Sequence, residues 1–269
     1  MTKTTKGKAV ATASNTSLSA PQMDQMAGFA NKGMESVGVG DVIMPRLSIL
    51  QDLSPQVSTR KPEYIEGAEV GQILNVATAE VVDDIVVIPC VYKRHNIEWK
   101  PNRGGFVNDH GEDETMLNEC TRDDKGFDVH PNGNIIIPTA TWYCIDLFGN
   151  QLIIPMSRTQ LKPSRQWMSY ATSEKLDHPE KGKFTPPLFY RSYHLSTVIR
   201  DDGDNSWFVW NVKKGKTILE MNDPDLMAAA IRFEQMLSAG EVAAGAESFG
   251  DETSGSAGGN STKSDKDKF

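Results

Sequence analysis

Hydrophobic and polar positions along the chain alternate mostly with the short period of β-strands. Residues 71–80 alternate loosely, and residues 85–92 form an almost continuous apolar run. Such a run is expected for a strand that is buried on both faces. We therefore predict strands over these two segments, with a turn or bulge at residues 81–84.

Two predicted hairpins follow. Residues 135–148 are rich in β-branched and aromatic side chains, and a Phe-Gly-Asn turn leads directly into a second apolar run at residues 151–156. A turn between two such runs is typical of a β-hairpin. The second hairpin joins residues 188–200 to residues 207–212, because residues 201–205 are polar and contain glycine.

Two helices are also predicted. The first covers residues 157–173, although Pro163 limits how far back a regular helix can extend. The second covers residues 222–239 and has a proline in its first turn, as many helices do. Its apolar stripe consists of Leu226, Ala230, Phe233 and Leu237.

The resulting order of elements is strand, strand, strand, helix, strand, strand. This order is expected of an OB-fold, a five-stranded barrel with a helix between its third and fourth strands. We therefore predict a mainly β, OB-fold-like domain over residues 41–239 that ends in a C-terminal helix. Residues 100–134 then form a very long loop between the first two strands. Residues 1–40 are predicted to be a flexible N-terminal segment, and residues 240–269 a disordered, mildly acidic tail.

The composition of the chain narrows the classes of protein to which it can belong. The chain of 269 residues has 28 Lys and Arg against 36 Asp and Glu, a formal charge of −8. This excludes a wholly basic nucleic-acid wrapper but not a local basic surface. The longest apolar run is too short to cross a bilayer, so no membrane association is expected. Three cysteines without a CxxC pair favour a reducing cytoplasmic setting.

Cations and aromatic residues are interleaved at the end of the first apolar strand. Single-stranded nucleic acid suits such a mixture, because cations contact phosphates and each ring stacked on a base contributes about 1–3 kcal/mol. The candidates are Lys93, Arg94, Trp99, Lys100, Arg103 and Phe106. The alternative is a strand with its rings in the core and its charges in solvent.

A second segment in which cations and aromatic residues are interleaved covers residues 158–200. It contains eight Lys and Arg and three acidic residues, a net charge of +5. Arg191 and Tyr193 share a strand face with Phe189, which places a cation between two rings. The candidates are Arg158, Lys162, Arg165, Trp167, Tyr170, Arg191 and Tyr193. Two core rings beside an edge arginine remain the alternative.

Residues 109–128 are strongly acidic, with eight carboxylates against two cations. A nuclease would need such carboxylates on rigid elements, whereas glycines here predict a flexible loop and the EF-hand pattern is not matched. Solvated loop charge is the favoured explanation; the loop would alternatively mimic phosphates and cover the basic groove. Zinc spacing, P-loop and GxSxG motifs are all lacking, so we expect no catalytic residue, metal or cofactor.

The chain resembles the bacteriophage single-stranded DNA-binding proteins in its predicted strand order and in its ending, Asp265-Lys266-Asp267-Lys268-Phe269. In that family an OB-fold precedes a flexible acidic tail with an aromatic last residue. The stretch Met44 to Gln51 also resembles an opening found in small phage proteins of replication gene clusters. Lysines interrupt the acidic residues of this tail, which departs from the family pattern.

The resemblance implies a protein that coats unpaired DNA during phage replication or recombination, in the cytoplasm of the host bacterium, without strong sequence preference. Asp265, Asp267 and Phe269 of the tail would then bind replication proteins. A non-catalytic virion or assembly protein that makes protein–protein contacts is the second hypothesis. A carboxylate-dependent nuclease ranks third.

Overall fold

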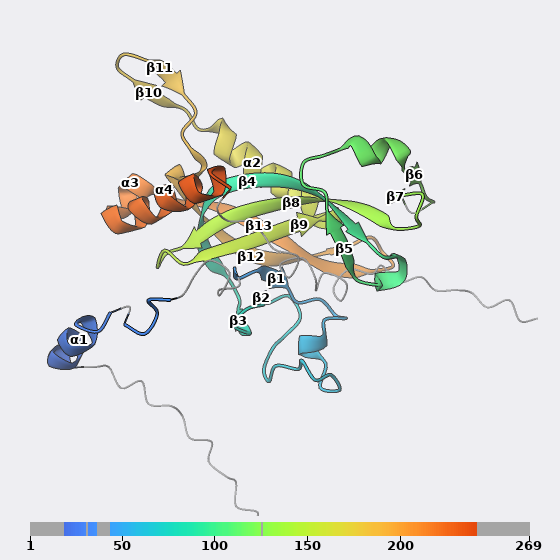
Figure 1. The fold of residues 1–269 in the computed structure, drawn as a ribbon, viewed down its shortest axis with the longest axis horizontal. Coiled ribbons are helices and arrows are strands. Elements are labelled where there is room, and N and C mark those ends of the chain that lie inside the picture. Colours follow the sequence, from blue (N-terminus) through green and yellow to red (C-terminus); the bar gives the residue numbers. More distant parts are fainter. Residues whose placement is uncertain (1–18, 31, 37–43, 125, 241–269) are drawn as a thin grey trace, which may run out of the picture. The chain divides into compact units, whose positions relative to one another are not determined.

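The computed structural model describes residues 19–30, 32–36, 44–124 and 126–240 (Figure 1). The chain divides into two compact units, residues 1–42 and 43–269. The predicted C-terminal tail beyond residue 240, with Asp265, Asp267 and Phe269, lies outside the described residues, as does most of the predicted N-terminal segment.

The described part of the first unit contains one helix, α1 (Ala20–Ala27), within the segment predicted to be flexible. The Ser19 backbone N–H donates to the Gln22 side chain (2.9 Å), and Pro21 lies in the first turn. Both features favour a helix start. Its side chains are all exposed.

The second unit is mainly β, as predicted. Its strands are β1 (Leu47–Ile49), β2 (Ile73–Asn75), β3 (Glu80–Val82), β4 (Ile85–Trp99), β5 (Phe106–Asp109), β6 (Thr121–Arg122), β7 (Asp128–Val129), β8 (Ile135–Asp146), β9 (Gln151–Ser157), β10 (Leu176–His178), β11 (Gly182–Phe184), β12 (Arg191–Asp201) and β13 (Ser206–Thr217). Its helices are α2 (Leu161–Ser173), α3 (Ile218–Met221) and α4 (Pro224–Ser238). Short 3-10 turns are η2 (Pro55–Val57), η3 (Pro101–Arg103), η4 (Thr115–Glu119), η5 (Arg158–Gln160) and η6 (Leu188–Tyr190).

Strands β4 and β8 pair antiparallel along nearly their whole length and form the spine of a curled sheet (Figure 1). At one end, which we call the apolar end, β12 pairs with the start of β4, β13 pairs with β12, and β9 pairs with β8. At the other, which we call the polar end, β5 pairs with residues 97–99 of β4, and β7 pairs with residues 135–136 of β8. The two ends therefore share two strands and differ in everything packed around them.

Both faces of the apolar end are covered. On one face, Trp167 of α2 stacks on Trp142 of β8 at a centroid distance of 4.1 Å, and Tyr193 of β12 packs edge-on against Trp167. On the other face, α4 buries its predicted apolar stripe against a cluster that includes Tyr143. Neighbouring residues of a strand point to opposite faces. Trp142 and Tyr143 therefore belong to two separate hydrophobic clusters.

Side-chain amides occupy the edge of β13. Gln51 accepts from the Phe208 N–H (2.9 Å) and donates to the Phe208 carbonyl (2.9 Å), while Gln160 donates to that carbonyl and accepts from the Trp210 N–H (3.1 Å). The Ile153 N–H of β9 donates to the Pro45 carbonyl (2.8 Å). The stretch of residues 44–51 therefore contacts both β9 and β13, and within the described chain these two strands form no ladder with each other.

The polar end differs from prediction. The sequence predicts a strand that ends at Tyr92 and an unstructured loop over residues 100–134, whereas β4 extends to Trp99 and this β4–β8 connection contains β5, η4, β6 and β7. The extension is stable because residues 97–99 have ladder partners on both edges. Ile97 and Trp99 also form a small apolar cluster with Ile137.

Candidate functional site

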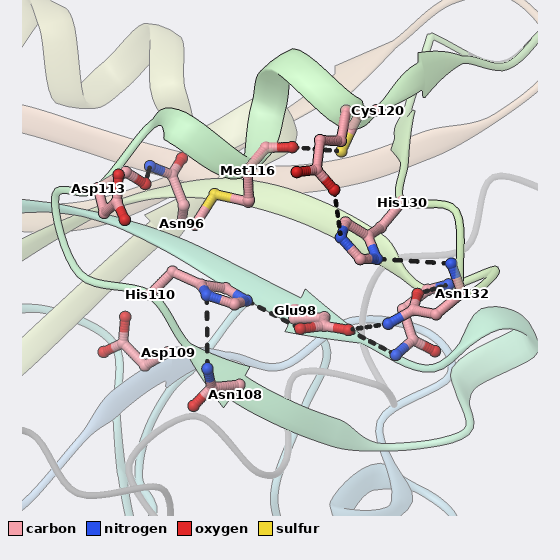
Figure 2. A network of polar contacts seen from close by, with 12 residues as sticks. Asn96, Glu98, Asn108, Asp109, His110, Asp113, Met116, Cys120, His130 and Asn132 are labelled. Carbon is pink, nitrogen blue, oxygen red and sulfur yellow. Dashed lines mark hydrogen bonds and ion pairs between the residues drawn. The ribbon is translucent and has the colours of Figure 1, made fainter.

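A buried carboxylate organises the polar end (Figure 2). Glu98 of β4 is 6% exposed and accepts hydrogen bonds from Nδ2 of Asn132 (2.9 Å) and Nδ2 of Asn134 (2.6 Å), in the turn before β8. Its other oxygen lies 2.8 Å from Nε2 of His110, which follows β5. Burial opposes ionisation, but the hydrogen bonds from Asn134, Asn132 and His110 outweigh it and hold the pKa of Glu98 below its ordinary value.

A second histidine–carboxylate pair fixes the start of the β4–β8 connection. Nδ1 of His95 lies 2.8 Å from Oδ2 of Asp109, and Asp109 also accepts from the Gly111 N–H. Burial opposes ionisation of Asp109, but these hydrogen bonds and the charge of His95 lower its pKa overall. Asn96 adds a side-chain bond to the Asp113 carbonyl (3.0 Å). The start of the acidic connection is therefore fixed to β4 rather than flexible.

The network contains histidine, cysteine and carboxylate side chains, the residue types that also form metal and nucleophile sites. Nε2 of His130 lies 3.8 Å from Oε2 of Glu119, and the Cys120 thiol donates to the Met116 carbonyl (Figure 2). Burial and nearby carboxylates raise the pKa of the Cys120 thiol, which keeps it protonated. Within the described ranges, no three His, Cys, Asp or Glu side chains are grouped to hold a metal ion. The carboxylates are satisfied by protein donors, so their evident role is to hold the connection in place.

Three of the predicted stacking rings lie in the core, and for these residues the prediction is wrong. Trp99 is 5% exposed, Trp167 is fully buried and Tyr193 is 1% exposed. Trp167 lies on the side of α2 that packs against the sheet. Tyr193 of β12 points into the same hydrophobic cluster. Trp99 packs edge-on against Phe106, which remains half-buried. Tyr170 is also half-buried and accepts a hydrogen bond from Gln166.

The predicted cations do not form one group either. Arg191 binds Glu174 (2.5 Å) and donates to the Gly215 carbonyl (2.6 Å), so its guanidinium is engaged inside the fold. The Lys93 ammonium lies 5.8 Å from the centroid of the Tyr143 ring, on the face of the sheet that α4 covers. The side chain of Arg103 lies outside the described residues.

Four of the predicted cations are exposed on one face of the sheet, which we call the basic face: Arg94, Arg158, Lys162 and Arg165. Arg94 alternates with Lys93 and so points to the side of α2. Arg94 pairs with Ala140, which pairs with Met156 just before η5. Because neighbouring strands are about 4.8 Å apart, the backbones of Arg94 and Met156 lie about 10 Å apart. Lys100 is exposed beyond the end of β4.

The acidic connection lies next to the basic face. The Arg158 guanidinium is 4.8 Å from the centroid of the Phe127 ring, in the turn between β6 and β7. Sequence reasoning missed both this contact and the Glu98 network. A single acidic residue between Ile97 and Trp99 was the available signal for the network, but its partners lie 12 to 36 residues away along the chain.

Comparison with known proteins gives one family. Residues 11–243 match the family described as Pam3 phage gp34-like protein. No curated protein and no solved structure matches the chain significantly. In the part of the chain that the structure describes, every helix is too short or too polar to traverse a lipid bilayer.

Proposed function

The chain belongs to the Pam3 phage gp34-like protein family, and we propose that it binds single-stranded DNA through its basic face. In this role it would cover unpaired DNA during phage replication or recombination with little sequence preference. Replication proteins are the proposed partners of its C-terminal tail.

The observation that carries the proposal is the basic face itself. A chain with a net charge of −8 exposes Arg94, Arg158, Lys162 and Arg165 on one side of one sheet. The local potential depends on the nearby charges rather than on the sum over the molecule. Several cations exposed on one side of a sheet suit a polyanion with regularly spaced phosphates.

The order of strand pairing supports the same proposal. The sequence β13-β12-β4-β8-β9, with α2 between β9 and β12, is the order in which OB-fold strands neighbour one another. We infer a partly open barrel of this type. In OB-folds, the second and third strands and the loops after the first and fourth strands bind oligonucleotides. Here these elements are β8, β9, the β4–β8 connection and the turn between β12 and β13. The basic face borders them, because Arg94 of β4 pairs with a residue of β8 and Arg158 directly follows β9, whereas Lys162 and Arg165 lie outside them on α2.

The buried rings restrict the mode of binding. With Trp99, Trp167 and Tyr193 in the core, the half-buried Phe106 and Tyr170 are the predicted rings that remain for base stacking. Binding would therefore rest on phosphate contacts and depend steeply on salt. Four contacts to a single strand give a slope of log K against log salt of about −3.

The test is a titration of end-labelled oligothymidylate followed by anisotropy at several salt concentrations, because tryptophans in the core report poorly on a surface ligand. The double variant Lys162→Gln/Arg165→Gln should bind roughly tenfold or more weakly near 0.1 M salt, with a slope smaller by about 1.4. Arg232→Gln is the matched control, since Arg232 is exposed on α4, against the opposite face. Absence of binding by the unaltered chain at low salt, or equal losses in variant and control, would contradict the proposal.

One observation favours a virion or assembly role instead. Phe148 is 90% exposed, in the turn between β8 and β9. Asp146 fixes this turn by accepting from the Phe148 and Asn150 N–H groups (2.8 Å each), and Gly149 adopts φ +82°. A rigidly held exposed aromatic is a common anchor of protein interfaces. This role predicts an oligomer in light scattering that Phe148→Ser dissociates and oligonucleotide leaves unchanged.

A further inference from the structure

A hairpin between α2 and β12 stands apart from the main sheet. Strands β10 and β11 pair only with each other and project from the second unit (Figure 1). The turn is fixed by His178, whose Nδ1 accepts from the backbone N–H groups of Glu180 (3.1 Å) and Lys181 (3.2 Å). Lys175 donates to Thr185 across the base. We call residues 175–185 the arm.

The arm has an apolar side and a charged side. Phe184 is directly opposite Leu176 in the ladder and is 41% exposed, whereas Asp177 and Lys183 face the other way. A two-stranded hairpin alone is only marginally stable in water. An arm that carries an exposed ring and buries little apolar surface is therefore suited to contact a ligand.

Lysines gather at the base of the arm. Lys213, Lys214 and Lys216 are exposed at the end of β13, and Glu174, just before the arm, binds both Lys214 (3.1 Å) and Arg191. The cations of the arm and its base are Lys175, Lys181, Lys183, Arg191, Lys214 and Lys216, whereas Lys213 alternates with Lys214 and points to the other face of β13. The nearby carboxylates are Glu174, Asp177, Glu180 and Glu220. Six cations against four carboxylates leave this region with a net charge of +2.

We infer that the arm and the β13 lysines form a second binding surface, which takes the same single-stranded nucleic acid as the basic face. This inference rests on the proposed function. Helix α2 leads from Lys162 and Arg165 to the arm, and its 13 residues at 1.5 Å each are about 20 Å long. A strand that lies along α2 reaches both surfaces. The lysines contact its phosphates, and Phe184 stacks on a base.

An arm that carries an exposed ring on one side and a lysine on the other distinguishes nucleic acid from an acidic protein as the occupant. Cations alone suit either polyanion, whereas stacking on an aromatic face is the additional contact that an unpaired base makes. A binder of acidic peptides would lose little when the ring is removed. The ring and the lysines therefore need separate variants.

The experiment compares oligothymidylates of about 8 and about 30 nucleotides. One OB-fold covers roughly 4–16 nucleotides, so only the longer strand can extend from the basic face to the arm. Lys181→Gln/Lys183→Gln should weaken binding of the long strand roughly tenfold and reduce its salt slope by about 1.4, with little effect on the short strand. Phe184→Ser should weaken long-strand binding roughly fivefold, within the ~1–3 kcal/mol of a stacked base, and leave the salt slope unchanged. Arg232→Gln, an exposed cation on α4, is again the matched control.

The outcomes separate this inference from the proposed function. If the unaltered chain binds and the arm variants match it at both lengths, the inference is wrong and the proposed function stands. If the unaltered chain binds neither strand, both are wrong. Competition by polyglutamate as effective as that by oligothymidylate, together with full affinity of Phe184→Ser, would assign the arm to an acidic protein and overturn the inference.

Discussion

At the apolar end of the β4–β8 pair, Trp142 packs between the rings of Trp167 of α2 and Tyr92 of β4, whereas at the polar end β4 carries the buried carboxylate of Glu98. The apolar end is stabilised by the burial of apolar surface. This effect is nondirectional and needs only side chains whose volumes fit together. The polar end is stabilised by donors at fixed positions, and a buried acceptor without its donors is costly. One strand pair thus supports a sealed core and a network that depends on protonation.

This difference bears on function. The apolar end uses its large rings internally and leaves cations of η5 and α2 on the surface. The polar end folds an acidic connection back over β4 and places Phe127 against Arg158 of the basic face. The apolar end therefore carries the proposed binding residues of η5 and α2, and the polar end, whose network depends on protonation, lies next to them.

The largest expected effect is on the free energy of unfolding and concerns the apolar end. Trp167→Ala removes a fully buried ring from the stack on Trp142 and should reduce the free energy of unfolding by about 3–5 kcal/mol. Urea denaturation measures it, with Gln166→Ala, an exposed neighbour on α2, as control within about 0.5 kcal/mol. The folded fraction should retain its affinity for oligothymidylate. A stable variant that specifically loses binding would return Trp167 to the binding surface.

A smaller and more local effect is expected at the polar end. Glu98→Ala leaves the side-chain donors of Asn132, Asn134 and His110 without their acceptor and should cost about 1–3 kcal/mol. Hydrogen exchange should accelerate in the β4–β8 connection and stay unchanged in α4. Glu112→Ala, an exposed acid in the same connection, is the control. Equal acceleration in both regions would show that the two ends unfold together.

Local sequence signals were sufficient for elements with a strong period. The run after residue 85, the hairpin of β8 and β9, and the apolar stripe of α4 were all predicted. Asp223 caps α4 by accepting from the N–H groups of Asp225 and Leu226. The strands of the connection were missed because β5, β6 and β7 have two to four residues each and depend on partners distant in sequence.

The alternation of residues along a strand predicts which side chains share a face of the sheet, but not what covers that face. Lys93 and Arg94 were both predicted to contact phosphates although alternation places them on opposite faces, and nothing local shows that α4 covers one face and α2 the other. The grouping of Arg191 with Tyr193 failed for the same reason. Tyr193 points into a cluster completed by α2, and Arg191 is engaged by Glu174, 17 residues earlier. Whether an interleaved ring stacks on a ligand or on the core is decided by tertiary packing.

The smallest expected effect distinguishes the two ends by pH. The pKa of Glu98 and that of Asp109 are held below their ordinary values, about 4.3 and 3.9 in an unfolded chain. Their stabilising contribution is therefore complete above those values and is lost as the pH falls through the lower values of the folded protein. Below about pH 4, hydrogen-exchange protection of the β4–β8 connection should decrease before that of the apolar end, after correction for the intrinsic exchange rate. Glu98→Gln should flatten this dependence, because the amide does not titrate in this range, and an unchanged pH profile in the variant would remove Glu98 from the explanation.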